Sequence, residues 1–214
     1  MKKFFTYVSM QKPDDLKKLN YKPVGNDELN PDLEVFFPIS MLIDCYVDKD
    51  DVIAVVCIIE RKNENIEANF ETLKKEVGMV CAEKDAEVNF VPVYSDKSES
   101  AASHLHTFKG LIDTVEDGDD IFVCCTYGTK PIPIIEMMAM NYAYRLGDNV
   151  SIKSLVYGKV ERQGRDIVGA YLYDISALFY MNQIVNSLAE QKIKNPERIL
   201  KNMLAIEDPS DEEE

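Results

Sequence analysis

The fold of this chain is decided by residues 119–133, which read DDIFVCCTYGTKPIP. An apolar run with strand character, Ile121 to Cys125, stops at the sequence TYGTKP. Apolar residues then take up helical spacing from Ile134 to Leu146. The stretch therefore predicts a strand, a tight glycine turn and the start of a helix, with hydroxyl groups and one lysine at the junction.

This junction has the chemistry of a phosphate site. Unpaired N–H groups at a helix start favour an anionic ligand, and in open α/β sheets ligands bind beyond the carboxyl ends of the strands. Proline lacks an N–H group, so the contact would come from the N–H groups of Gly128, Thr129 and Lys130. The candidate ligand-binding residues here are Thr126, Tyr127, Gly128, Thr129, Lys130 and Pro131. The simpler alternative is an ordinary turn with a solvated Lys130.

The sequence on either side repeats the alternation of strand and helix. Strands are expected at 4–10, 52–59 and 88–94, and helices after Pro38 and over 66–80, 101–115 and 178–188. Residues 152–160 and 167–174, joined through Gln163-Gly164-Arg165, indicate a hairpin. We therefore predict an α/β, Rossmann-like fold: a mostly parallel sheet flanked by helices, with a C-terminal antiparallel hairpin added at one edge.

One domain is expected to occupy residues 1–190. A C-terminal helix is predicted within 191–206, after Pro196, and a disordered acidic tail over 207–214. The long polar stretch between the first strand and residue 34 is interpreted as a connection. Charged pairs such as Asp119 and Asp120 are interpreted as solvated loop residues, and Glu136 as a residue of a helix face.

The composition narrows the range of functions. A net charge of −14 over 214 residues argues against a general binder of long nucleic acid, although a small phosphorylated ligand remains compatible with it. The five cysteines show no CxxC pair or metal-ligand spacing, so neither a metal nor a cofactor is expected. No signal peptide or long apolar run is found, so we expect a cytoplasmic protein without a membrane partner.

A second segment completes the candidate site. Ser9, Met10, Gln11 and Lys12 end the first strand. In a doubly wound sheet that end lies beside the end of the fourth strand, so these residues should face the junction. The alternative is a solvated surface loop.

The order of these motifs resembles the CRISPR-associated Rossmann fold (CARF) family. The resemblance is carried by the TYGTKP turn and the helix after it, by LVYG at 155–158 and by YDIS at 173–176. Weaker agreement is found in FFPISML at 36–42 and DDVIAV at 50–55. It covers residues 1–188, with its specific part between 119 and 176.

The resemblance implies a homodimer that binds cyclic oligoadenylate across its two-fold axis. In this family the ligand is a second messenger made by type III CRISPR complexes, and some members also cut the ring. Cutting needs no metal, because a ribose 2′-hydroxyl can attack its own 3′-phosphate if the site aligns it and stabilises the charge. Ser9 and Lys130, or Lys12, are the candidate catalytic helpers, whereas His104 and His106 are interpreted as solvated. The sequence itself supports the homodimer in one respect: one helix carries more apolar surface than a single core-facing side needs. The residues concerned are Met137, Met138, Met140 and Tyr144.

Two departures from the family leave questions open. The loop at 9–13 is bulkier than the glycine loop common in this branch, which leaves the ring size and any cleavage undecided. Many members also continue into an effector domain, so this chain is either a standalone sensor or ring nuclease, or the sensor part of a larger effector. A third hypothesis is an unrelated nucleotide-binding α/β regulator, although the glycine fingerprint for its ligands is absent.

Overall fold

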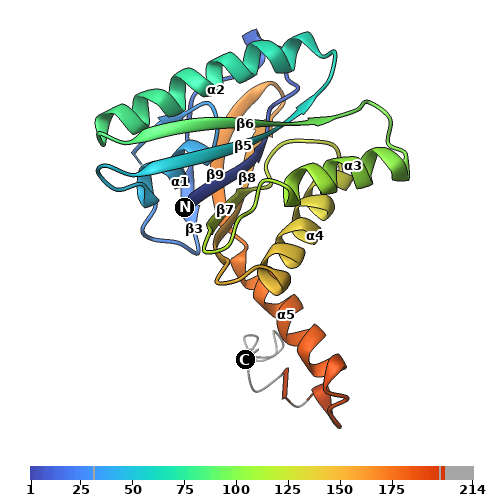
Figure 1. Ribbon diagram of the computed structural model, residues 1–214. Coiled ribbons are helices and arrows are strands. Elements are labelled where there is room, and N and C mark those ends of the chain that lie inside the picture. Colours follow the sequence, from blue (N-terminus) through green and yellow to red (C-terminus); the bar gives the residue numbers. More distant parts are fainter. Residues whose placement is uncertain (31, 198, 201–214) are drawn as a thin grey trace. The chain divides into compact units, whose positions relative to one another are not determined.

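The computed structural model describes residues 1–30, 32–197 and 199–200 (Figure 1). The chain divides into two compact units, residues 1–176 and 177–214, and the first holds the sheet. The sheet has seven strands in the order β3-β9-β8-β7-β1-β5-β6. Their bounds are Lys22–Val24 for β3, Asp166–Asp174 for β9, Ser151–Gln163 for β8, Asp120–Cys124 for β7, Lys2–Tyr7 for β1, Val52–Glu60 for β5 and Glu87–Ser95 for β6.

The centre of the sheet is parallel, as the sequence predicts. β1 pairs in parallel with β5 on one side and with β7 on the other, and β7 pairs in parallel with β8. Only β8 and β9 are antiparallel to each other within this sheet, across the predicted hairpin. The continuous apolar run of β5 is buried from Ile53 to Ile59, which is typical of a strand covered on both faces.

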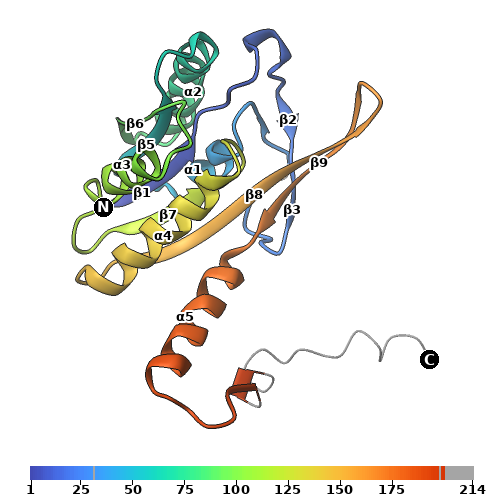
Figure 2. The same cartoon turned by 90° about the vertical axis from the view of Figure 1, so that its right-hand side faces the viewer.

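Helices cover both faces of the sheet (Figures 1 and 2). α1 (Ile39–Tyr46) contacts α2 (Glu64–Glu83), while α3 (Ala101–Ile112) packs against α4 (Pro131–Leu146). This is the two-faced arrangement of a doubly wound sheet, so the predicted α/β fold is confirmed. The helix predicted over 178–188 is α5 (Ser176–Glu190), most of which belongs to the second unit.

The edge of the sheet differs from the prediction. The hairpin is not the last element there, because β3 pairs in parallel with β9 from Lys22↔Tyr171 to Val24↔Tyr173. The stretch interpreted as a connection therefore supplies a sheet strand. It also supplies β2 (Leu19–Asn20), which pairs with β4 (Glu34–Val35) in a small antiparallel sheet, and the short 3₁₀ helix η1 (Pro13–Asp15). Pro23 fits the edge strand, because a missing N–H group costs little there.

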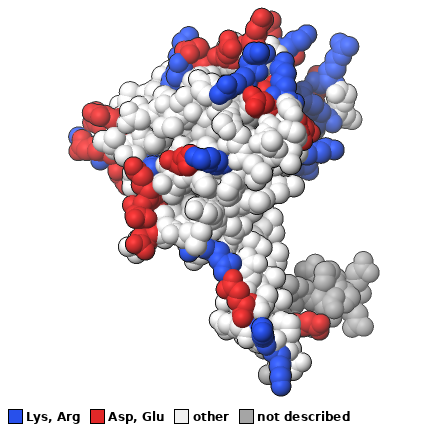
Figure 3. All heavy atoms as spheres, turned by 45° about the vertical axis from the view of Figure 1, so that its right-hand side comes forward, with Lys and Arg blue, Asp and Glu red and all other residues white. Residues whose placement is uncertain are grey.

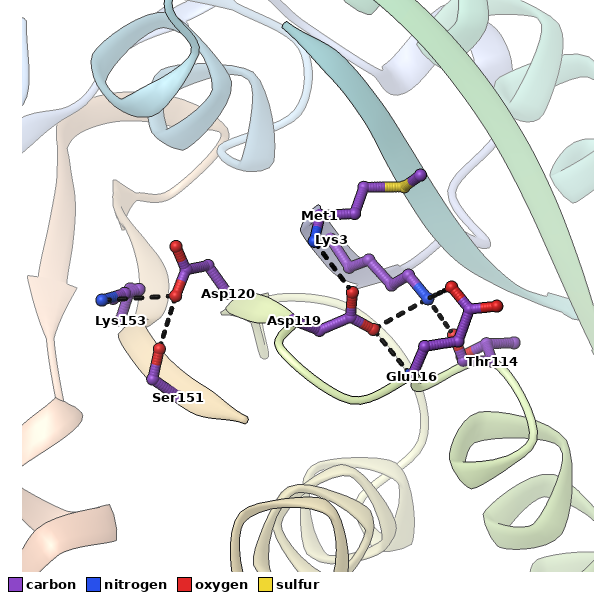
Figure 4. Close-up of polar contacts among 8 residues, drawn as sticks. All are labelled: Met1, Lys3, Thr114, Glu116, Asp119, Asp120, Ser151 and Lys153. Atoms are coloured by element: carbon purple, nitrogen blue, oxygen red, sulfur yellow. Dashed lines mark hydrogen bonds and ion pairs between the residues drawn. The ribbon is translucent and has the colours of Figure 1, made fainter. Parts of the chain in front are cut away.

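A buried ion-pair cluster joins the amino ends of β1 and β7 (Figure 4). The Lys3 ammonium lies 2.8 Å from a carboxylate oxygen of Asp119, and the two side chains are 6% and 1% exposed. Lys3 also donates to the Thr114 carbonyl at 2.7 Å, and the Glu116 N–H donates to Asp119 at 2.7 Å. The interpretation of Asp119 as a solvated residue was therefore wrong. This carboxylate fixes the end of the sheet that lies opposite the candidate site.

The two C-terminal predictions fall mostly on residues that are not described. Residues 198 and 201–206 of the expected helix and the whole acidic tail, 207–214, lie outside the described residues.

Candidate functional site

The two predicted segments both begin at the carboxyl-terminal end of the parallel strands. β1 and β7 are neighbours from Lys2↔Asp120 to Thr6↔Cys124, so residues 8–12 and 125–130 begin side by side. The prediction that the first and fourth strand ends are adjacent is confirmed. A phosphate site formed by both segments is therefore possible in this fold.

The turn after β7 is tied to β8 by a hydrogen bond. The Thr126 hydroxyl accepts a hydrogen bond of 2.9 Å from the Gly158 N–H of β8, and a Cβ on Gly158 would lie only 3.0 Å from Thr126. Gly128 has φ +108°, a conformation that other residues rarely adopt. Because its hydroxyl is engaged with β8, Thr126 positions the turn.

Beyond this turn the backbone offers free donors. In the part of the chain that the structure describes, no hydrogen bond is made by the N–H groups of Gly128, Thr129 and Lys130. The helix α4 begins at Pro131, and no side chain caps it. Lys130 is exposed at this helix start. Three free donors and one ammonium group favour an anion.

Tyr127 is half-buried and contacts the Phe36–Phe37 segment. Its hydroxyl donates to the Phe36 carbonyl at 3.1 Å, and its ring meets Phe37 edge to face at 6.2 Å. Burial raises the pKa of Tyr127 well above its usual value. In the described conformation the hydroxyl and ring of Tyr127, a predicted ligand-binding residue, are thus engaged with the protein itself.

The residues after β1 divide into a buried and an exposed group. Ser9 is fully buried, and its hydroxyl accepts from the Gln11 N–H at 3.3 Å. The carbonyls of Ser9 and Gln11 each accept a bond of 2.8 Å from the buried Asn69 side chain of α2. Met10 is half-buried, whereas Gln11 and Lys12 are exposed. The segment is thus anchored through Ser9 and offers Gln11 and Lys12 to a ligand.

A cleft of about 200 Å³ connects the two segments. Gln11 lines it from the first segment, and Thr126 and Tyr127 line it from the second, together with Gly158 of β8. Thr129 lines a separate, smaller cleft with Tyr7 and His104. His104 is half-buried, so only His106 fits the prediction of a solvated histidine.

Another hollow of the surface lies away from the strand ends. It has a volume of about 970 Å³ and follows the end of β5, where Arg61 lies over the Tyr94 ring at 5.2 Å. Its charged residues are Glu60, Arg61, Lys62, Glu64, Glu67 and Glu71. Four carboxylates against two cations make it a poor site for a phosphate. The strand ends therefore remain the candidate site for an anion.

Glu136, interpreted from the sequence as a residue of a helix face, is buried. It is 0% exposed on α4, and neither carboxylate oxygen has a hydrogen-bond partner among the described residues. Burial raises the pKa of Glu136 to about 8, against a smaller opposing effect of the Cys125 thiol. The carboxyl group is therefore neutral near pH 7. Within the described residues, no group of three or more histidines, cysteines or carboxylates is placed to hold a metal.

The fold and this site define an α/β protein with an anion-binding candidate site at the carboxyl ends of parallel strands. Comparison with known proteins adds one relative, a CRISPR-associated protein of Methanocaldococcus jannaschii. It is 25% identical over 115 residues, which cover 54% of this chain and 18% of the relative. The chain thus matches less than a fifth of that protein. No family model matches the sequence, and no helix among the described residues has the length and apolarity needed to cross a membrane.

Proposed function

We propose that this chain binds cyclic oligoadenylate as a homodimer in CRISPR-associated antiviral signalling in the cytoplasm. The observation that carries the proposal is the parallel pairing of β1 and β7. Because of this pairing, the two segments that bear Lys12 and Lys130 both begin at the carboxyl-terminal end of the sheet. The CARF-like motifs and the CRISPR-associated relative support the same function.

Each part of the site has a role in this proposal. The free N–H groups of residues 128–130 donate to phosphate oxygens, and the ammonium groups of Lys130 and Lys12 supply positive charge. Gln11 can donate to a base or a ribose. A net charge of −14 repels long nucleic acid, while local cations still accept a small ring.

An apolar stripe on α4 supports the homodimer. It consists of Ile134, Met138, Tyr142 and Leu146, spaced by four residues and 63%, 53%, 46% and 69% exposed. Residues at this spacing share one helix face, and an exposed apolar face of this kind is typical of an interface. The stripe begins one turn after Lys130, so a two-fold axis beside it would bring two copies of the site together. The predicted surplus was partly wrong, because Met140 is 1% exposed and belongs to the core.

Cleavage of the ring is a second candidate activity. The exposed Lys130 beside free N–H groups could stabilise the charge that develops when a ribose 2′-oxygen attacks its neighbouring phosphorus. The P–O5′ bond then breaks, which leaves a 2′,3′-cyclic phosphate and a 5′-hydroxyl. Ser9 is buried, so we expect it to act in this reaction by holding the segment in place.

Calorimetry with cyclic tetra-adenylate and cyclic hexa-adenylate, with chromatography of the ligand afterwards, tests the proposal. We expect binding of one of the rings, weakened at least tenfold in Lys130→Ala, which removes one charge-assisted contact. Lys49→Ala is the matched control, since Lys49 is exposed and pairs with Asp85 at 3.3 Å, away from the site. Preference for ATP or a dinucleotide would instead support the unrelated regulator. If the chain is the sensor of a larger effector, ring binding should persist with intact ligand.

A further inference from the structure

A groove on the hairpin side of the site carries unexplained positive charge. Two adjoining clefts of about 200 Å³ and about 600 Å³ form it, between the segment after β1 and the tip of the β8–β9 hairpin. Figure 2 shows this segment and the orange hairpin tip rising to the same end of the molecule. Thr126 and Tyr127 line the smaller cleft, so the groove continues the strand-end site. The larger cleft has a volume within the usual range of small-molecule sites.

One face of β8 forms the wall of this groove. Gly158 and Val160 alternate along the strand and line the smaller cleft, and Arg162, which follows an irregularity in the β8–β9 pairing after Glu161, lines it too. Lys159, on the opposite side, is paired with Glu161 at 2.8 Å. The two-residue turn then brings Arg165 to the larger cleft, beside Arg162.

The cations of the groove are poorly neutralised. The two clefts are lined by four cationic residues, Lys12, Lys17, Arg162 and Arg165, and by two carboxylates, Asp15 and Asp166. In the described part of the chain the side chains of Lys12, Arg162 and Arg165 form no ion pair, and the Lys17 ammonium donates to the Asp14 carbonyl at 2.9 Å. Figure 3 shows Lys and Arg side chains gathered at the upper right of the molecule.

Such a group is unusual in a chain with 38 acidic and 24 basic residues. Like charges held in one groove repel one another, and a bound anion would relieve that repulsion. Arginine is suited to phosphate in particular, because its planar guanidinium donates two parallel hydrogen bonds to phosphate oxygens.

We propose that this groove is a second phosphate-binding subsite for a short oligoribonucleotide, with Arg162 and Arg165 as its main donors. The inference rests on the proposed function and extends it to the hairpin. Each chain then has two places for phosphate, the turn at 128–130 and the hairpin tip. A homodimer has four, which fits a ring of at least four phosphates.

The test is a titration of the full chain with cyclic tetra-adenylate and cyclic hexa-adenylate at low and high salt. We expect Arg162→Ala and Arg165→Ala each to weaken binding about tenfold, and the double variant to show a shallower salt dependence. Both side chains are exposed, so folding should be unaffected. Restoring the charge with Arg162→Lys and Arg165→Lys should recover the salt dependence and part of the affinity. Lys49→Ala should behave as the wild type.

Two outcomes would overturn the inference, and they are distinguishable. If the double alanine variant binds the ring with unchanged affinity and salt dependence while Lys130→Ala binds weakly, the hairpin has no role and the proposed function stands. If the wild-type chain binds neither ring, the proposed function fails and the inference fails with it.

Discussion

Replacing Glu136 with glutamine should make the protein more stable at neutral pH. The carboxyl group is 0% exposed and lacks a hydrogen-bond partner among the described residues, so its ionised form is strongly disfavoured in the folded state. Its pKa is raised from 4.5 to about 8. Glutamine has nearly the same shape as the neutral acid and cannot ionise.

The sign and size follow from proton linkage. Between pH 4.5 and about 8 the folded chain keeps a proton on Glu136 that the unfolded chain loses, so the free energy of unfolding falls as the pH rises through this window. One pKa unit corresponds to about 1.4 kcal/mol, so the wild type loses about 3 kcal/mol through this group between pH 5 and pH 7.5. Glu136→Gln removes this loss. Its advantage should therefore be small at pH 5 and grow by about 3 kcal/mol at pH 7.5.

Urea unfolding of both proteins across this pH range measures the effect. Glu83→Gln is the control, because Glu83 is exposed at the end of α2 and should give nearly the same difference at every pH. An advantage of Glu136→Gln that does not change with pH would refute the reasoning. It would mean that the carboxyl group has a normal pKa in the folded protein.

Three further substitutions test other parts of the structure. Asp119→Ala should cost about 3 kcal/mol of unfolding free energy in urea, because it removes the buried carboxylate that pairs with Lys3 and the N-terminal ammonium and leaves Lys3 only the exposed Glu116 carboxylate at 3.2 Å; a loss below about 1 kcal/mol, the size expected for an exposed pair, would show that the buried pair contributes little. Gly128→Ala should lower the free energy of unfolding by about 1–3 kcal/mol, because φ is +108° and the added Cβ would lie 3.1 Å from Ile132. The control is Gly78→Ala in α2, where the added Cβ meets nothing within 4 Å, and this change should be stabilising. Met138→Glu should dissociate the proposed homodimer into monomers in analytical ultracentrifugation, with Val168→Glu on the exposed hairpin as control. A dimer that survives the change would exclude the α4 stripe as the interface.

The parallel core could be predicted from the sequence because its signals are local. The apolar run of β5 and the strand-turn-helix order around Gly128 each occupy one continuous stretch, and the handedness of α/β units leaves few ways to connect them. The adjacency of the first and fourth strand ends followed from that topology and is confirmed.

The sheet edge could not be predicted because its signal is short and depends on a distant partner. β3 has three residues, one of them Pro23, and it is recognisable only once β9 is in place. The environments of the buried residues Glu76 and Glu136 could not be predicted from the local sequence either. Glu76 accepts three hydrogen bonds, from the Phe36 and Phe37 N–H groups and the Ser40 hydroxyl, whereas Glu136 accepts none that the structure describes. Nothing in the local sequence distinguishes these environments.

The sequence predicted which two segments lie side by side at the candidate site, but not how each of their residues is engaged. Ser9, Thr126 and Tyr127 are engaged with the protein itself, while Gln11, Lys12 and Lys130 are exposed. The residues that the prediction missed, Asn69 and Arg162, come from a helix and a hairpin far along the chain. A hairpin arginine becomes a candidate only when the fold brings it to the first segment.

The number of rings bound per chain tests the central claim most directly. We expect calorimetric titration with cyclic tetra-adenylate or cyclic hexa-adenylate to saturate at one ring per two chains, with the dimer confirmed by light scattering in the same solution. That stoichiometry requires two copies of the strand-end site to share one ligand. Saturation at one ring per chain, or no binding of either ring, would contradict the account.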